Sequence, residues 1–281
     1  MAQTLAETIV RPQGSAWSPL ERMYRDEPVF TVGGLVLLAL MLPMALALAL
    51  DDRLFQGIDV WDKPLKFAFA LATYLLTLAF YARWLPAGMT ARPAYRVYSG
   101  LVMAAIVAEM TWISGAATFG TGSHFNEATP TLMRLYALMG ILAVLLTSAT
   151  AVYAVGIARN RGFRAGPAAR AALVAGLGLA FPLTLLCAGI LAQNGGHWVG
   201  GTADDAGGLA LMGWSRDGGD LRVPHFFATH AMHFVPAFGL VSMALFGPGR
   251  RLPVLIFGAA YAGFVLWALM QALAGQPFPF G

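Results

Sequence analysis

The stretch that decides the fold is VFTVGGLVLLALMLPMALALAL, which runs from Val29 to Leu50 and contains no charged residue. A helix rises 1.5 Å per residue and the bilayer core is about 30 Å thick, so about 20 apolar residues cross it. A secretory signal peptide has an apolar core of only about 7–15 residues. The run therefore predicts an uncleaved membrane-spanning helix.

Six further runs have the same character. They predict spans at about Lys66–Pro86, Val97–Thr118, Thr131–Ala158, Ala168–Gln193, Pro224–Gly247 and Leu252–Gly275. None alternates with period two over about ten residues, which disfavours a β-barrel. The sequence thus predicts an all-α integral membrane bundle of seven transmembrane helices. We expect a cytoplasmic N-terminal segment over 1–28, the bundle over 29–275 and a short outer tail over 276–281.

The composition supports this class. The chain of 281 residues is 58% hydrophobic and only 11% charged, whereas average soluble domains are about 25% charged. A soluble enzyme, a nucleic-acid-binding domain and a disordered chain are therefore excluded, and the expected partner is the lipid bilayer. The single cysteine, Cys187, allows neither an intramolecular disulfide nor a cysteine metal cluster.

The basic residues predict the orientation. If the N-terminus is cytoplasmic, twelve of the 18 Lys and Arg residues fall on cytoplasmic segments, while the outer loops hold nine of the 14 acids. Lys and Arg accumulate on the cytoplasmic side of membrane proteins, so the predicted orientation is N-in and C-out. Before the first span, the stretch Ser18–Glu21 has the N-cap, first-turn proline and capping-box glutamate of a short helix.

Polar chemistry collects on the outer side, where all five histidines lie. His225, His230 and His233 share the sixth span, His124 follows the third, and His197 lies in the loop from Asn194 to Val223. His230 and His233 are three residues apart and share a helix face. His225 is about 140° around the helix from His230, so a loop residue such as His124 is its more suitable neighbour.

Glu109 is the only acid inside a predicted span. Counting from Thr118 places it about 13 Å below the outer surface, near the depths of Tyr74, His230 and His233. A charged residue in a membrane helix costs about 2.5–3.5 kcal/mol on insertion scales and usually faces a partner or a polar cavity. A polar functional site in this layer is therefore the main prediction, although any one of these histidines could simply cap a helix or bind a carbonyl.

A metal centre is one interpretation of this layer. The candidate metal ligands are His124, His225, His230 and His233, and the candidate catalytic residues are Glu109, Asp220 and Arg222. Three of the histidines share one helix and no other span contains one, so a non-haem Zn, Fe or Cu ion fits better than haem. Asp220 and Arg222 could instead pair with each other. Standard membrane-protease and ATPase motifs are absent.

Three outer patches resemble a family of bacterial polytopic membrane proteins that has no assigned activity. The motifs are Trp61-x-Lys63-Pro64-x-Lys66-Phe67, Ser123-His124-Phe125-Asn126 and Gly219-Asp220-Leu221-Arg222-x-x-His225-Phe226, together with Gly213-Trp214-Ser215 and His230. The resemblance extends over about Pro28 to Gly275 and implies a multi-pass protein of the inner membrane. In that family the position of His233 is often Gln, which favours His124, His225 and His230 with Glu109 as the site.

Three functions remain open at this stage. The main hypothesis is a membrane-embedded metal-binding protein or metalloenzyme, an oxidoreductase or hydrolase acting on a lipid-like or small substrate, and the other two are alternatives. The second is a transporter of a small solute or protons that uses Glu109 and His230 as relay groups; it needs a polar route to the cytoplasm, for which the sequence offers Tyr153 and the hydroxyls of Thr147, Ser148 and Thr150. The third is a scaffold without a site. The oligomeric state is not predicted.

Overall fold

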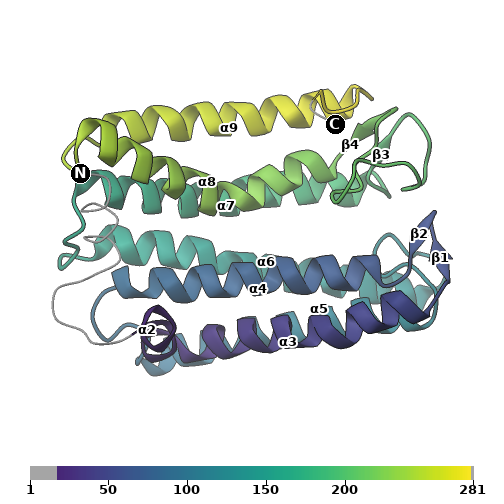
Figure 1. The fold of residues 1–281 in the computed structure, drawn as a ribbon, viewed down its shortest axis with the longest axis horizontal. Coiled ribbons are helices and arrows are strands. Elements are labelled where there is room, and N and C mark those ends of the chain that lie inside the picture. Colours follow the sequence, from purple (N-terminus) through teal and green to yellow (C-terminus); the bar gives the residue numbers. More distant parts are fainter. Residues whose placement is uncertain (1–17, 280–281) are drawn as a thin grey trace.

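Seven long apolar helices lie side by side along the molecule (Figure 1). A computed structural model describes residues 18–279, so residues 1–17 and 280–281 of the predicted terminal segments lie outside the described residues. The helices are α3 (Pro28–Leu50), α4 (Asp62–Tyr81), α5 (Pro93–Thr118), α6 (Pro130–Arg159), α7 (Pro167–Gln193), α8 (Arg222–Phe246) and α9 (Leu252–Leu273). The predicted all-α seven-helix membrane bundle is confirmed.

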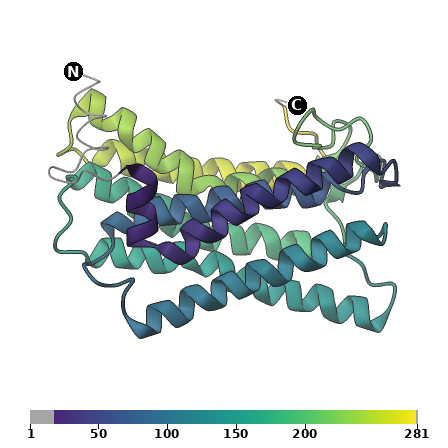
Figure 2. The same ribbon diagram turned by 60° about the horizontal axis from the view of Figure 1, so that its bottom comes forward.

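Prolines mark where many of these helices begin. Pro28, Pro93, Pro130 and Pro167 each occupy the first turn of their helix, where the missing N–H costs nothing because that turn has no intrahelical acceptor. The predicted short helix is also confirmed: α2 (Pro19–Asp26) begins with a complete Ser18–Glu21 capping box. This helix lies across the end of α3 (Figure 2).

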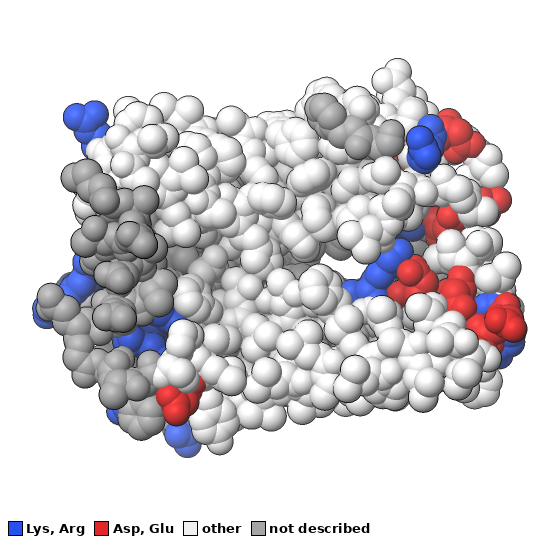
Figure 3. All heavy atoms as spheres, viewed as in Figure 1, with Lys and Arg blue, Asp and Glu red and all other residues white. Residues whose placement is uncertain are grey.

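The two ends of the bundle differ in structure and charge. At one end, which we call the strand end, β1 (Leu54–Phe55) pairs with β2 (Ile58–Asp59), and β3 (Trp198–Val199) pairs with β4 (Gly219–Asp220). At the other, the α2 end, helices are joined by short segments and by the 3-10 turn η1 (Ala82–Trp84). Lys and Arg predominate at the α2 end, acids gather at the strand end, and most of the surface between them is uncharged (Figure 3).

The helices form two groups with α6 between them. One group is α3, α4 and α5, and the other is α7, α8 and α9 (Figure 1). The second group is packed very closely, because a side-chain carbon on Gly239 would lie only 2.4 Å from Cβ of Ala172. Small residues permit this approach between backbones in a membrane. The core runs through both groups and includes the fully buried Leu75, Ile106 and Leu177.

Two hydrogen bonds join α4 to α8 among residues 18–279, and both lie near a proline. Pro236 has no N–H, so the carbonyl of Met232 has no intrahelical donor. The hydroxyl of Tyr81 donates to that carbonyl at 3.0 Å, and Thr77 Oγ1 lies 3.0 Å from His233 Nε2. We call this pair of contacts the α4–α8 joint. A neighbouring helix therefore supplies the donor that the proline removes, as membrane helices require.

Candidate functional site

Lys63 lies at the centre of the polar residues at the strand end. The helix α4 begins at Asp62, four residues before the predicted start, so Lys63 belongs to its first turn. Its ammonium interacts electrostatically with Asp205, Arg222 and Glu109. Among residues 18–279 it forms no ion pair and no hydrogen bond, and the ring of Phe67 lies 6.0 Å away. Lys63 is thus a cation without a bonded counter-ion.

Glu109 faces the same region from α5. Its side chain is only 5% exposed, and within the described part of the chain the buried Oε1 has no hydrogen-bond partner. The charge that acts on this carboxyl is that of Lys63. The sequence placed Glu109 beside His230 and His233, and did not single out Lys63 as its partner because the lysine appeared to belong to an outer loop. The predicted phenol of Tyr74 is engaged elsewhere, since it donates to the carbonyl of Leu146 at 2.6 Å.

His124 and His225 form one neighbouring pair. His124 Nδ1 lies 3.0 Å from Ser123 Oγ, and its ring packs beside Phe67 at 5.5 Å between centroids. Burial, followed by the charges of Lys63 and His225, holds the pKa of His124 well below its usual range, so the ring is neutral at physiological pH. His225 Nδ1 is buried and has no hydrogen-bond partner among the described residues.

His230 and His233 form the second pair, about one and a half to two turns after His225 on α8. Their ring centroids are 5.1 Å apart. His230 Nδ1 lies 3.1 Å from Thr229 Oγ1. His233 contacts Thr77 through Nε2, while its buried Nδ1 has no partner within residues 18–279. We refer to Lys63, Glu109 and these four histidines as the strand-end site.

The geometry gives the predicted metal centre no support. Across the described residues, no group of three or more His, Cys, Asp or Glu side chains is placed to hold a metal ion. The four candidate ligands, all histidines, form two pairs. The only carboxyl in the strand-end site, that of Glu109, has Lys63 as its charged neighbour. A non-haem Zn, Fe or Cu ion therefore remains a prediction from sequence alone, with haem the less suitable alternative.

The long loop over 194–221 closes the strand end through two buried carboxylates. Asp205 lies 3.0 Å from His197 Nε2 and 2.8 Å from Arg222 Nη2. Asp220 binds Arg222 at 2.6 Å and accepts the N–H of Ser215 at 2.9 Å. The predicted pairing of Asp220 with Arg222 is therefore present, and these contacts fix the loop on α8.

Asp205 was not a candidate from the sequence. Burial by itself would raise its pKa, but the hydrogen bond with His197 and the charge of Arg222 outweigh burial and hold the pKa below its usual range. The length of the polar loop was the signal that it held functional residues. The pairing itself depends on how that loop folds, so the sequence pattern does not specify it.

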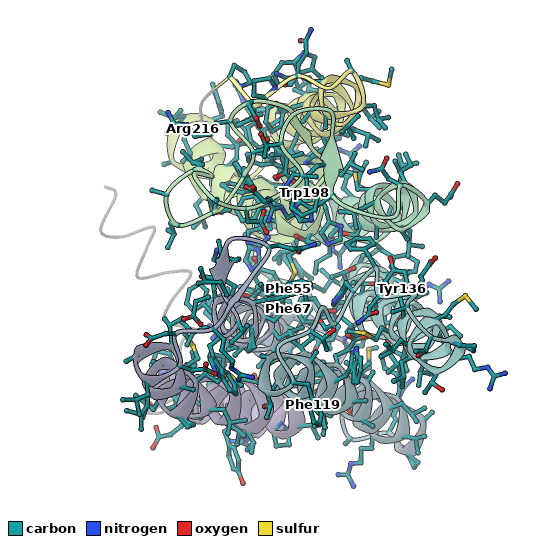
Figure 4. All side chains as sticks on the ribbon, turned by 90° about the vertical axis from the view of Figure 1, so that its right-hand side faces the viewer. Phe55, Phe67, Phe119, Tyr136, Trp198 and Arg216 are labelled. Carbon is teal, nitrogen blue, oxygen red and sulfur yellow. The ribbon has the colours of Figure 1, made fainter. Side chains whose placement is uncertain are left out.

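A hollow separates the two helix groups near this site. In Figure 3 the molecule is hollowed between the group above and the helices below, and charged residues border the strand-end side of the hollow. The cations at the start of α4 and α8 are Lys63, Lys66 and Arg222. Seen from the strand end, Phe55 and Phe67 are drawn below Trp198 (Figure 4). The ring of His124 lies 5.5 Å from that of Phe67 and 6.2 Å from that of Tyr136, between centroids, so aromatic side chains border the site.

The comparisons with known proteins identify no relative: no family model, no curated protein and no solved structure matches the chain. The resemblance of the three outer patches to a bacterial membrane-protein family therefore stays a prediction. The function has to be inferred from the chemistry of the strand-end site.

Proposed function

We propose that the protein is a transporter that binds a small polar solute at the strand-end site. One observation is decisive for this proposal: Lys63 and Glu109 have opposite charges and share one region, yet neither forms an ion pair within the described chain. Leaving a buried polar or charged group without a partner is costly. A bound solute removes that cost for the buried Glu109 carboxyl and also gives the partly exposed ammonium of Lys63 an anionic partner.

The chemistry of the site indicates a zwitterionic solute. A carboxylate or similar anion suits the Lys63 ammonium, and a protonated amine suits the Glu109 carboxyl. The partnerless Nδ1 atoms of His225 and His233 add two neutral hydrogen-bonding positions. A solute with a single charge would satisfy only one of the two unpaired groups, so the site favours molecules that have both.

Transport fits the architecture better than catalysis on a fixed scaffold. The hollow lies between the two helix groups. Within residues 18–279, the hydrogen bonds that connect α4 to α8 are the two of the α4–α8 joint. Substrate sites of transporters typically lie at the interface between two groups of helices that move against each other. We further propose that the basic α2 end faces the cytoplasm and that the protein lies in the bacterial inner membrane.

The test is solute binding and uptake by purified protein in liposomes. The probes are alanine, β-alanine and γ-aminobutyrate, which increase in charge separation, with propionate and ethylamine as singly charged controls. We expect at least one zwitterion to raise the melting temperature and to be taken up. Lys63→Gln and Glu109→Gln should each weaken binding at least tenfold, about 1.4 kcal/mol.

Matched controls separate the site from general charge loss. Arg134→Gln removes an exposed cation and Glu127→Gln removes an exposed acid, so both should bind like the unmodified protein. Binding that is unchanged in Lys63→Gln and Glu109→Gln would overturn the proposal. Elemental analysis of the same sample decides the competing function, because a stoichiometric transition metal that disappears in folded His230→Ala would establish a metalloprotein instead.

A further inference from the structure

Two turns at the α2 end have five exposed arginines and no acidic residue. One turn connects α6 to α7 and the other connects α8 to α9 (Figure 1). We call the five residues the arginine patch: Arg159, Arg161, Arg164, Arg250 and Arg251. The sequence has no acid from Ala128 to Ala203 or from Leu221 to Gly281. Within residues 18–279, none of the five side chains forms a hydrogen bond or an ion pair, so the described chain leaves this positive charge unpaired.

The two turns lie against each other. The backbone N–H of Ala168 donates to the carbonyl of Pro248 at 3.0 Å. Gly166 fits closely against the same residue, because a side-chain carbon there would lie only 3.1 Å from the Pro248 carbonyl oxygen. Arg164 and Arg250 are each two residues along the chain from these contacts. The arginines of both turns therefore belong to one continuous surface.

The turn between α6 and α7 has a fixed backbone. Asn160 donates through Nδ2 to the carbonyl of Trp84 at 2.8 Å and accepts the N–H of Gly162 at 2.9 Å. Arg170 donates to the carbonyl of Asn160 and lies over the ring of Phe163, 5.1 Å from its centroid. Arginines on such a turn extend from defined positions, so little backbone order has to be gained when a ligand binds.

Exposed apolar side chains adjoin the arginine patch along the bundle. Leu245 and Phe246 end α8 and are 70% and 46% exposed, and Leu252, which begins α9 directly after Arg251, is 64% exposed. At the end of a membrane helix, arginines reach the head groups while apolar side chains contact the acyl chains. A ligand that satisfies both kinds of side chain has an anionic head and an apolar tail.

We infer that the arginine patch binds the head group of an anionic phospholipid from the leaflet at the α2 end, with the acyl chains against Leu245, Phe246 and Leu252. Arginine pairs with phosphate oxygens through two parallel N–H groups. Clusters of about four to eight Lys and Arg residues at the ends of membrane helices typically bind anionic lipids. This inference does not rest on the proposed transport function, because the strand-end site lies at the opposite end of the bundle.

The experiment is native mass spectrometry of the full-length protein in detergent, titrated with dioleoylphosphatidylglycerol. Dioleoylphosphatidylcholine, which has the same acyl chains and no net charge, is the control lipid. We expect phosphatidylglycerol to bind about tenfold more tightly or better, and to raise the melting temperature. The double variant Arg250→Gln with Arg251→Gln should lose this preference. Lysine at both positions should retain part of it, because the charge remains but the paired N–H groups do not.

A matched control separates a lipid site from general attraction to positive charge. Arg92→Gln with Arg96→Gln removes two exposed arginines from the same end of the bundle, at the beginning of α5, and should leave phosphatidylglycerol binding unchanged. An equal loss in the two glutamine pairs would overturn the proposal, and so would equal binding of the two lipids. Displacement of the lipid by an equal concentration of glycerol 3-phosphate would show a site for soluble anions instead.

A second variant keeps the test decisive if the first fails to fold. It neutralises the other turn through Arg159→Gln, Arg161→Gln and Arg164→Gln, and should weaken phosphatidylglycerol binding about tenfold or more; unchanged binding would overturn the proposal. Both variants should bind the zwitterions of the strand-end site normally. Failure of the lipid site and failure of the solute site can therefore be told apart in one set of samples.

Discussion

At the scale of single residues, Asp205 connects more of the strand end than any predicted site residue. Its carboxylate binds His197 and Arg222, and its backbone N–H donates to the carbonyl of Gln56 at 2.9 Å. The long loop, α8 and the β1–β2 hairpin therefore meet at one residue. Because the carboxylate is buried and charge-paired, removing its charge leaves Arg222 with one partner fewer.

Replacing Asp205 tests this arrangement. Asp205→Asn should destabilise the protein by about 2–3 kcal/mol, because a buried charged partner is lost. Its pKa is lowered by folding, so this stability is present at pH 7 and is lost as the pH falls below the ordinary aspartate pKa of about 3.9. The measurement is the melting temperature in detergent between pH 7 and pH 3, with the neighbouring Asp204→Asn as control. A difference between the two variants that does not shrink in acid would contradict the assignment.

Residues inside apolar spans were the easiest to predict. Glu109 and the three histidines of α8 stand out because an ionisable residue is rare in such a run. Lys63 and Asp205 did not, since each is one charge among many at a helix end or in a loop. Their roles depend on where the long loop folds back, and a pattern of residue types holds no information about that contact.

At the scale of helices, α8 depends on α4 at its proline. Met232 has no intrahelical donor for its carbonyl, and Tyr81 supplies one. Tyr261 on α9 makes a similar bond of 2.7 Å to Phe227, but four residues after Phe227 stands an alanine, which keeps its N–H. The two tyrosines thus make comparable hydrogen bonds. The carbonyl of Met232 lacks an intrahelical donor, whereas that of Phe227 has one.

Removing the two hydroxyls should therefore have unequal effects. Tyr81→Phe leaves a buried carbonyl unpaired and should cost about 1–3 kcal/mol, whereas Tyr261→Phe should cost about 1 kcal/mol or less. Pro236→Ala restores the intrahelical donor, so Tyr81→Phe should cost clearly less in that background. A double-mutant cycle of unfolding free energies measures this coupling. Additive effects of Tyr81→Phe and Pro236→Ala would show that the joint does not work in this way.

Helix ends followed from the sequence to within about four residues, and at α4 this difference changes the interpretation of the site. The runs of apolar residues located α3, α5, α6 and α7 to this precision. The start of α4 was placed too late, because Asp62, Lys63 and Lys66 resemble a loop when judged by polarity. The helix includes them since Asp62 and Lys66 pair one turn apart and their heads reach the aqueous end of the bundle.

At the scale of the whole molecule, the charge asymmetry predicts how the bundle is inserted. The α2 end is mostly basic, and the strand end has most of the acids (Figure 3). If the α2 end is cytoplasmic, the strand end and the proposed solute site face outward. The orientation thus decides from which side a solute would reach the site.

Cysteine labelling tests the orientation. In a Cys187→Ala background, Tyr24→Cys reports on the α2 end and Glu127→Cys on the strand end, since both positions are exposed. A membrane-impermeant maleimide should label Glu127→Cys in right-side-out vesicles and Tyr24→Cys in inside-out vesicles. The opposite pattern would reverse the predicted topology without altering the fold.

The α4–α8 joint has a mechanical consequence. From Met232 to Arg222 the helix α8 extends about 15 Å toward the strand end, so the joint acts as a fulcrum with the proposed solute site on the shorter arm. A tilt of about 10° there displaces the first turn of α8 by about 2.6 Å, roughly the diameter of a water molecule. The bond from Asp205 to Gln56 spans the two moving parts at the far end of that arm. It is therefore the first contact to stretch when α8 tilts. In the proposed transporter, the long loop would separate from the β1–β2 hairpin in the same movement that admits a solute.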